Sequence, residues 1–389
     1  MANRNRVIYQ SEGLFVSAGA ASGSLVSHEQ LGRVQSANYS FTINRQDVNQ
    51  YGDLARIDSL VLDPPTVSLD FSYYLADGFN ERALGFFVQN SGADGTQRDC
   101  KFTDQYASGN FASGHLTANS GVNMFIVTSP DGEDLNKAGA GESIDASDTV
   151  IGVGNCYLTD YSLDLSVGSL PTVSVTMEGA NMRSTSDGST IVSPAVDQEA
   201  GTALATAISL PNPTEDGGVT GQYDQAPITA LRPGDITVSL SNIDGDSLAT
   251  IDGTTSSAHI QSVSVGLPLS RSPIQRLGSK FPFARDVDFP VDISMSVSAI
   301  MNDTNTDNLV SILDAGVQNV SFTINDPDGS TAAIYGELKG IKVDSQSFSS
   351  SIGSNKTVDL TFSTQVGGPQ DVANGFFMSG LGFNTVFTA

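Results

Sequence analysis

The stretch that decides the fold is VQSANYSFTINRQDVNQYG, from Val34 to Gly52, because a second stretch repeats its pattern. The second stretch is IQSVSVGLPLSRSPIQRLG, from Ile260 to Gly278. In both, apolar and polar residues alternate, which is typical of a β-strand with one buried face. Each stretch then continues into a polar patch that ends at a glycine. The repeat raises the question of whether the chain contains two copies of one structural unit, each with this strand and this polar patch.

The similarity between the two parts of the chain extends beyond these stretches. Further matches preserve the apolar positions, and one pair of segments ends in Pro-Asp-Gly, a turn sequence, in both copies. Because all the matches occur in the same order, they predict an internal duplication. The matched segments are residues 34–77 with 260–303, residues 123–134 with 319–331, and residues 167–177 with 352–362.

Composition agrees with a folded, mainly β chain. Hydrophobic residues make up 39% of the sequence and charged residues 16%, while 39 glycines indicate many turns. We expect two tandem sheet-rich domains, each with a short flanking helix. For the second copy the helix is predicted at Thr306–Gly316, where Leu309 and Leu313 have helical spacing. The sequence leaves its counterpart in the first copy open.

The predicted domain boundaries follow from this duplication. Long Gly- and Ser-rich insertions are placed in the first copy, at Leu84–Gly121 and Glu133–Gly152. Both ends of the chain suit arms that become ordered on assembly. The predicted parts are an N-terminal arm (1–20), a first domain (21–182), a linker (183–225), a second domain (226–366) and a C-terminal arm (367–389).

Charge and cysteine content restrict the functional class. Against 43 acidic residues there are 18 basic ones, a net charge of −25, which argues against tight nucleic-acid binding. It suits solubility, or a surface past which DNA moves without adhering. No apolar run is long enough for a membrane span, so a soluble chain made in a cytoplasm is expected. Cys100 and Cys156 are expected to be reduced, although their pairing stays open.

Sequence motifs of catalysis and metal binding are lacking. The three histidines are scattered, and no nucleophile, phosphate-loop or zinc pattern occurs in its required context. Asp303–Asp314 has the oxygen spacing of a calcium loop, but Asn308 stands where the loop needs glycine and Asp314 where it needs glutamate. We therefore expect no catalytic residue, no cofactor and no bound metal.

The repeated polar patch has two interpretations. It follows the first long strand in each copy, so it can be an arm that reaches a neighbouring subunit. It can equally be an ordinary polar hairpin loop. The candidate inter-subunit residues are Arg45, Gln46, Asp47, Asn49, Gln50 and Tyr51 in the first copy and Arg271, Gln275 and Arg276 in the second.

Three stretches resemble a known protein family. They are INRQDVNQYGDLARID, DPPTVSLDFSYYL and NCYLTDYSLDLSVGSLPTVSVTMEGANM, which begin at Ile43, Asp63 and Asn155. They resemble major tail tube proteins of tailed bacteriophages, especially of marine phages. The resemblance is densest over residues 34–77 and 155–182, and fainter over 260–303 and 338–364.

This resemblance implies a structural virion protein. In such proteins, β-sandwiches join the sheets of neighbours into an inner barrel, a flanking helix lies beside them, and a long loop reaches adjacent rings. Rings of six units imply a trimer of this duplicated chain, with pseudo-sixfold symmetry. Implied partners are the chain itself, other tail proteins, which can include a sheath, and phage DNA that passes through without specific binding.

The same resemblance implies that the protein is located in the virion tail, is assembled in the host cytoplasm and has no membrane partner. The alternative is a phage or cell-surface β-sandwich adhesin or carbohydrate-binding protein. The absence of tryptophan argues against this alternative, because sugar-binding platforms favour indole rings.

Overall fold

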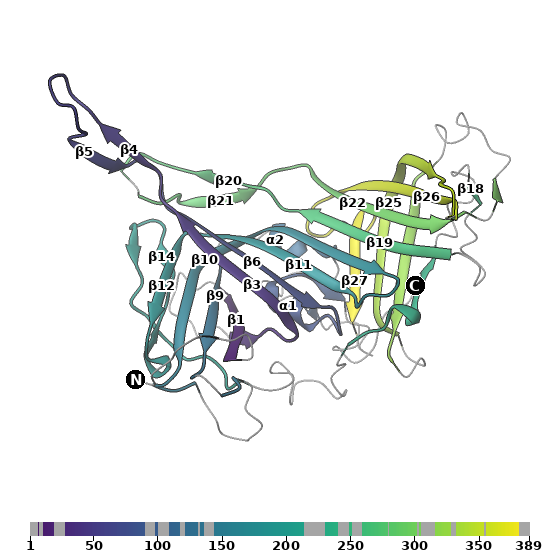
Figure 1. Cartoon of the computed structure of the whole chain (residues 1–389), viewed down its shortest axis with the longest axis horizontal. Coiled ribbons are helices and arrows are strands. Elements are labelled where there is room, and N and C mark those ends of the chain that lie inside the picture. The colour runs from purple at the N-terminus through teal and green to yellow at the C-terminus, as the bar shows by residue number, and fades with distance from the viewer. Residues whose placement is uncertain are drawn as a thin grey trace.

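The computed structural model confirms the mainly β fold class (Figure 1). Two short helices, α1 (Phe79–Leu84) and α2 (Ser113–Leu116), and the 3-10 turns Gly188–Thr190 and Pro233–Asp235 accompany the strands. The structure describes residues 7, 11–18, 28–89, 98–99, 109–116, 121–130, 133–135, 144–213, 230–239, 249–250, 259–278, 280–301, 303–304, 316–327, 332–353 and 355–380.

One antiparallel sheet, here called the shared sheet, runs through both copies. Its strands alternate in sequence as predicted, with apolar side chains on the core face and polar ones on the other. In spatial order it contains β3 (Val34–Thr42), β6 (Thr66–Tyr74), β11 (Thr172–Gly179), β10 (Thr149–Ser166), β19 (His259–Pro268), β22 (Val291–Ile300), β26 (Thr357–Val366) and β25 (Ala332–Ser349).

Two back sheets pack behind the shared sheet, the first built from the first copy and the second from the second copy with β7 and β8 of the first copy added. The first contains β2 (His28–Gln30), β1 (Glu12–Ala18), β9 (Val122–Thr128), β10 and β12 (Asn181–Thr185). The second contains β17 (Ile236–Ser239), β24 (Gln318–Asn325), β25, β27 (Gly375–Gly380), β7 (Val88–Gln89) and β8 (Arg98–Asp99). A separate pair joins β18 (Ala249–Thr250) to β23 (Asp303–Thr304).

The long strands β10 and β25 leave their back sheet and enter the shared sheet at equivalent points. At this bend Asn155 and Gly340 have positive φ angles of 52° and 71°. Their backbone N–H groups donate to the side-chain carbonyls of Asn123 (3.2 Å) and Asn319 (3.3 Å). A left-handed residue turns the strand, and the bonded asparagine fixes the turn. The two copies therefore use the same local device to connect two layers.

The strand registers repeat as well. The β3–β6 ladder skips Gln35, and the β19–β22 ladder skips Gln261. Each glutamine donates its side-chain amide to the carbonyl two residues earlier, that of Arg33 (3.0 Å) or His259 (3.3 Å). Bulges break a ladder and tend to be retained within related units. Their coincidence supports the duplication inferred from sequence.

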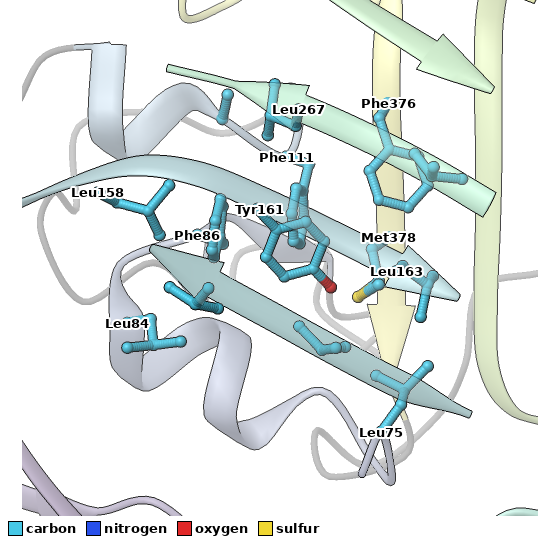
Figure 2. Packing of buried hydrophobic residues seen from close by; sticks show 14 of the residues in the cluster. Leu75, Leu84, Phe86, Phe111, Leu158, Tyr161, Leu163, Leu267, Phe376 and Met378 are labelled. Carbon is cyan, nitrogen blue, oxygen red and sulfur yellow. The ribbon is translucent and has the colours of Figure 1, made fainter. Parts of the chain in front are cut away.

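A single hydrophobic core lies between the shared sheet and the back sheets, and it joins the copies (Figure 2). Phe111 stacks on Phe86, with 4.2 Å between ring centroids, and contacts Tyr161 edge-on at 5.2 Å. Phe376, from the second copy, meets the Phe111 ring at 5.0 Å. Because aromatic contacts cross from one copy to the other, the halves share their core.

Residues after β12 cover the outer face of the first back sheet. They include the strand pairs β13 (Ile191–Val192) with β16 (Ala207–Ile208), and β14 (Val196–Asp197) with β15 (Thr202–Ala203). A second apolar cluster lies beneath them. It contains Phe15, Phe125, Val127, Leu135, Val150, Ile191 and Leu210.

The observed elements differ from the predicted boundaries at three places. Glu12–Ala18, assigned to an N-terminal arm, is strand β1, and Gly375–Gly380, assigned to a C-terminal arm, is strand β27. Both segments pair within the chain and bury apolar side chains such as Phe15 and Phe376. The predicted linker from residue 183 begins inside β12 and continues as the cover of the first back sheet.

Helix α1 follows β6, the position that the predicted helix Thr306–Gly316 has after β22. Most of Thr306–Gly316 lies outside the described residues, as does most of the calcium-like segment. Helix α1 is bounded by left-handed Gly78 and Gly85, and it turns the carboxyl group of Glu81 into the core. The helix thus places an ionisable group inside an apolar layer.

Glu81 makes stability depend on pH. Its carboxyl group accepts hydrogen bonds from Tyr73 Oη (2.8 Å) and Tyr161 Oη (3.5 Å), and burial raises its pKa from 4.5 to about 7. The folded state therefore binds a proton that the unfolded state releases between these values. Stability from this proton is complete below pH 4.5 and is lost as pH rises through 7.

We expect Glu81→Gln to remove this dependence, because glutamine keeps the acceptor for Tyr73 and does not ionise. Between pH 5 and pH 8 the wild type should lose on the order of 3 kcal/mol more unfolding free energy than the variant. Urea titrations at fixed protein concentration measure the difference. Burial also raises the pKa of Asp77, which contributes a slope of the same sign in both proteins. Equal slopes would mean that Glu81 is already ionised at neutral pH.

Candidate assembly surface

The two copies meet at an antiparallel strand pair inside the chain. Strand β10 of the first copy pairs with β19 of the second, with Leu163 opposite Val265 and Tyr161 opposite Leu267. These side chains are buried. At this internal junction, pairing with β10, the last shared-sheet strand of the first copy, covers β19, the first shared-sheet strand of the second copy.

Strand β3, the counterpart of β19, has no such neighbour in the described part of the chain, since its ladder is with β6 alone. The consequence is visible at matched positions. Leu267 is 0% exposed, whereas its counterpart Phe41 is 60% exposed. Leu269 is likewise 0% exposed, and its counterpart Ile43 is 38% exposed. The equivalent strands are therefore covered in the second copy (β19) and uncovered in the first (β3).

The opposite end of the shared sheet gives the same result. Residues 342–349 of β25, the counterpart of the β10 segment at the junction, pair with β26 and with no other described strand. Phe348 is 43% exposed, while its counterpart Leu163 is 0% exposed. Both ends of the sheet thus expose apolar side chains beside an unpaired strand edge, an arrangement that native proteins normally avoid.

The first predicted patch forms a hairpin, β4 (Arg45–Val48) with β5 (Asp58–Val61), that extends away from the sheets (Figure 1). Its side chains are exposed, including those of Tyr51 and Leu54 at the tip. Asp47 forms an ion pair with Arg56 at 2.8 Å within the hairpin. The candidate residues Arg45, Gln46, Asp47, Asn49, Gln50 and Tyr51 therefore lie together on one exposed arm.

The second patch forms the matching hairpin, β20 (Arg271–Ile274) with β21 (Ala284–Val287), which lies against the first copy of the same chain. Arg271 Nη2 donates to the carbonyl of His115 at 2.7 Å, and Arg276 Nη2 donates to that of Glu199 at 2.8 Å. Burial lowers the pKa of Arg271 to about 10, so it stays charged at neutral pH. Gln275 is exposed. Arg271 and Arg276 thus connect the two copies within one chain.

The solvent face of the shared sheet, here called the serine face, carries short hydroxyl side chains. One row of directly opposed residues crosses the strands from β3 to β26, and Lys342 on β25 follows it. Serine side chains bond across this face, as between Ser36 and Ser72 (2.7 Å). The row consists of Ser36, Ser72, Ser174, Ser162, Gly266, Ser294 and Ser363.

Acidic groups occupy rows within two of the serine row on this face. They are exposed, and they outnumber the basic side chains at these strand positions. A face with carboxylates and few cations repels polyanions and offers them few ion pairs. The aspartates are Asp70, Asp160, Asp164, Asp292 and Asp359.

Other site types find little support in the described residues. Within these ranges no group of His, Cys, Asp and Glu could hold a metal ion. Cys156 is a buried free thiol whose pKa burial raises to about 12, and Cys100 lies outside the described part. A pocket of about 80 Å³, lined in part by Phe125, Gly152 and Arg183, is far smaller than ordinary ligand pockets. No helix among the described residues has the length and apolarity needed to cross a membrane.

The chain was also compared with known proteins. Neither a scan against protein-family models nor a search of curated proteins finds a match to it. Interpretation of the assembly surface therefore depends on its own geometry.

Proposed function

We propose that the chain is a self-assembling structural protein whose subunits join head to tail through the shared sheet. The observation that carries this proposal is the contrast between matched positions, above all Leu267, which is buried at the internal junction, and Phe41, which is exposed at the free edge. In the proposed contact, β25 of one chain pairs with β3 of the next as β10 pairs with β19. Phe348 then lies opposite Tyr39, the counterparts of Leu163 and Val265.

A contact between different edges closes into a ring when its rotation permits. Each chain supplies two equivalent units, so three chains form a ring with pseudo-sixfold symmetry. Stacked rings of this kind form a tube. The resemblance to major tail tube proteins of bacteriophages favours this geometry, and with it we propose a location in a virion tail, together with other tail proteins.

The serine face is proposed to line the lumen of the tube. Its hydroxyl groups stay hydrated, and its aspartates repel the phosphates of a passing DNA duplex. Little attraction has to be overcome during passage because few cations are available to pair with phosphates. The same chemistry argues against a sequence-specific nucleic-acid site.

Electron microscopy and light scattering of the purified full chain test this function. We expect rings or hollow tubes with a lumen wide enough for a DNA duplex, built from a ring mass of three chains. A protein that remains monomeric across concentration, ionic strength and pH would overturn the proposal. Assemblies without a lumen would reject the tube while retaining self-association.

A further inference from the structure

The hairpin β20–β21 is held on the first copy by a small group of charged and aromatic side chains. Arg285 Nη1 forms an ion pair with Glu178 Oε1 at 2.6 Å, and the Arg285 side chain is buried. Arg271 donates to the carbonyl of His115 at 2.7 Å. Both guanidinium groups lie over the ring of Tyr157, at 5.0 Å for Arg271 and 5.9 Å for Arg285. This group defines a receiving site at the middle of β10 and the end of β11.

The strand registers identify the equivalent positions on the exposed hairpin β4–β5. Arg271 pairs with Val287 across β20–β21, and Arg45 pairs with Val61 across β4–β5. The position of Arg285 is therefore that of Ser59, two residues before Val61.

The receiving site has an equivalent on the second copy. Tyr157 and Glu178 are opposed in β10–β11, and Lys342 and Ser363 are opposed in β25–β26. Both pairs lie between the bend at which the long strand changes layer, at Asn155 or Gly340, and the bulge of their ladder, at Thr159 or Asp344. In the described part of the chain, no hairpin covers Lys342 and Ser363 in the way that β20–β21 covers Tyr157 and Glu178.

The exposed side chains of β4–β5 indicate that this hairpin lacks a contact of the kind that β20–β21 makes with the first copy. Val287 packs against the shared core, whereas Val61 is 49% exposed. Both strands of β4–β5 are almost wholly exposed, while Arg285 is buried in β21. At its base, the exposed hairpin therefore leaves apolar surface uncovered where its counterpart is packed, while the tips of both hairpins are exposed, as Tyr51 and Leu277 show.

We propose that β4–β5 docks on a second copy of this chain, on β25 and β26 beside Lys342 and Ser363. This inference rests on the proposed head-to-tail pairing. Because β3 continues directly into β4, as β19 continues into β20, pairing β3 with β25 carries the hairpin over the same relative surface. The occupant of this surface is thus the first-copy hairpin of the neighbouring chain.

This docking places a different set of side chains in the contact between chains. Ser59 and Ser363 replace the ion pair of buried Arg285 with partly exposed Glu178, and Arg45 approaches Lys342 instead of an aromatic ring. The contact between chains therefore lacks the ion pair that stabilises the contact within a chain, and two cations lie near each other. A chain folds with its internal hairpin fixed, whereas the hairpin between chains is held more weakly.

Installing the missing ion pair tests the geometry. Ser59→Arg combined with Ser363→Glu should lower the concentration for half-maximal assembly about tenfold more than the product of the two single fold-changes, as expected for a close charge pair. The comparison is Ser59→Arg with Ser296→Glu, which introduces the same charges but puts the carboxylate on β22. β5 and β26 lie on opposite sides of the molecule in Figure 1, so favourable coupling between positions 59 and 363 has to arise between two chains.

The outcomes separate this inference from the proposed function. Favourable coupling at positions 59 and 363, with none for the control, supports docking at this surface. If the wild type assembles but the two substitutions are merely additive, the docking site is wrong and the head-to-tail function stands. If the wild type does not assemble under any condition, the function fails first.

Discussion

Phe41→Asp and Phe348→Asp proteins should each remain monomeric, and should form a one-to-one dimer when they are mixed. Each change puts a carboxylate into one of the two proposed sheet edges, where pairing would bury it without a partner. In the mixture, the intact β25 of the Phe41→Asp chain can pair with the intact β3 of the Phe348→Asp chain. The remaining two edges are blocked, so growth stops at two chains.

Analytical ultracentrifugation of the separate and mixed proteins measures this result. Both substituted side chains are substantially exposed in the single chain, so circular dichroism should show an unchanged fold. Val317→Asp, at an exposed position outside both edges, serves as the control and should assemble as the wild type does. Assembly of either edge variant alone, or a mixture that stays monomeric, would contradict head-to-tail pairing.

Phe111→Ala should destabilise both halves of the molecule by about 3–5 kcal/mol, the usual range for loss of a buried aromatic side chain. The Phe111 ring is fully buried and contacts Phe86 and Tyr161 of the first copy and Phe376 of the second. Its backbone N–H also donates to the carbonyl of Phe376 at 2.7 Å. One substitution therefore removes contacts from both sides of the common core.

Urea unfolding followed by circular dichroism gives the loss of free energy, and hydrogen exchange of β6 and β26 reports each half separately. We expect the protection of both strands to fall together, since a continuous core unfolds cooperatively. Phe283→Ala, at an exposed phenylalanine, should cost less than about 1 kcal/mol. Loss of protection in β6 alone would mean that the copies unfold independently.

Alternation along the chain was sufficient to predict the mainly β class, and the matched segments in the same order predicted the duplication that the repeated strand registers support. Residues such as Tyr39 and Val265 stand at matching places in an alternating pattern, and this local pattern is a direct consequence of strand geometry. The polar patches after each strand correctly marked two related segments. The first hairpin is exposed, whereas the second packs on the first copy. This difference depends on whether a neighbouring surface is present, which the local sequence pattern does not encode.

The back sheets were harder to predict because strand pairing is not local. Phe15 and Phe376 lie in short, glycine-flanked segments that were assigned to terminal arms, but they fill the core once β9 and β25 supply partners. The polar segment after residue 183 was assigned to a linker. Its few apolar residues, such as Ile191 and Leu210, are enough to cover the outside of one back sheet.

The pairing of β10 with β19 inside one polypeptide affects how assembly depends on dilution. Because the polypeptide links the two strands, their effective concentration is fixed, and this pairing forms during folding at any protein concentration. In the proposed assembly, only the contact between β25 of one chain and β3 of the next depends on protein concentration. If the proposed ring forms, building it from three chains instead of six single units costs less translational and rotational entropy, so that weaker contacts between chains are enough to close it.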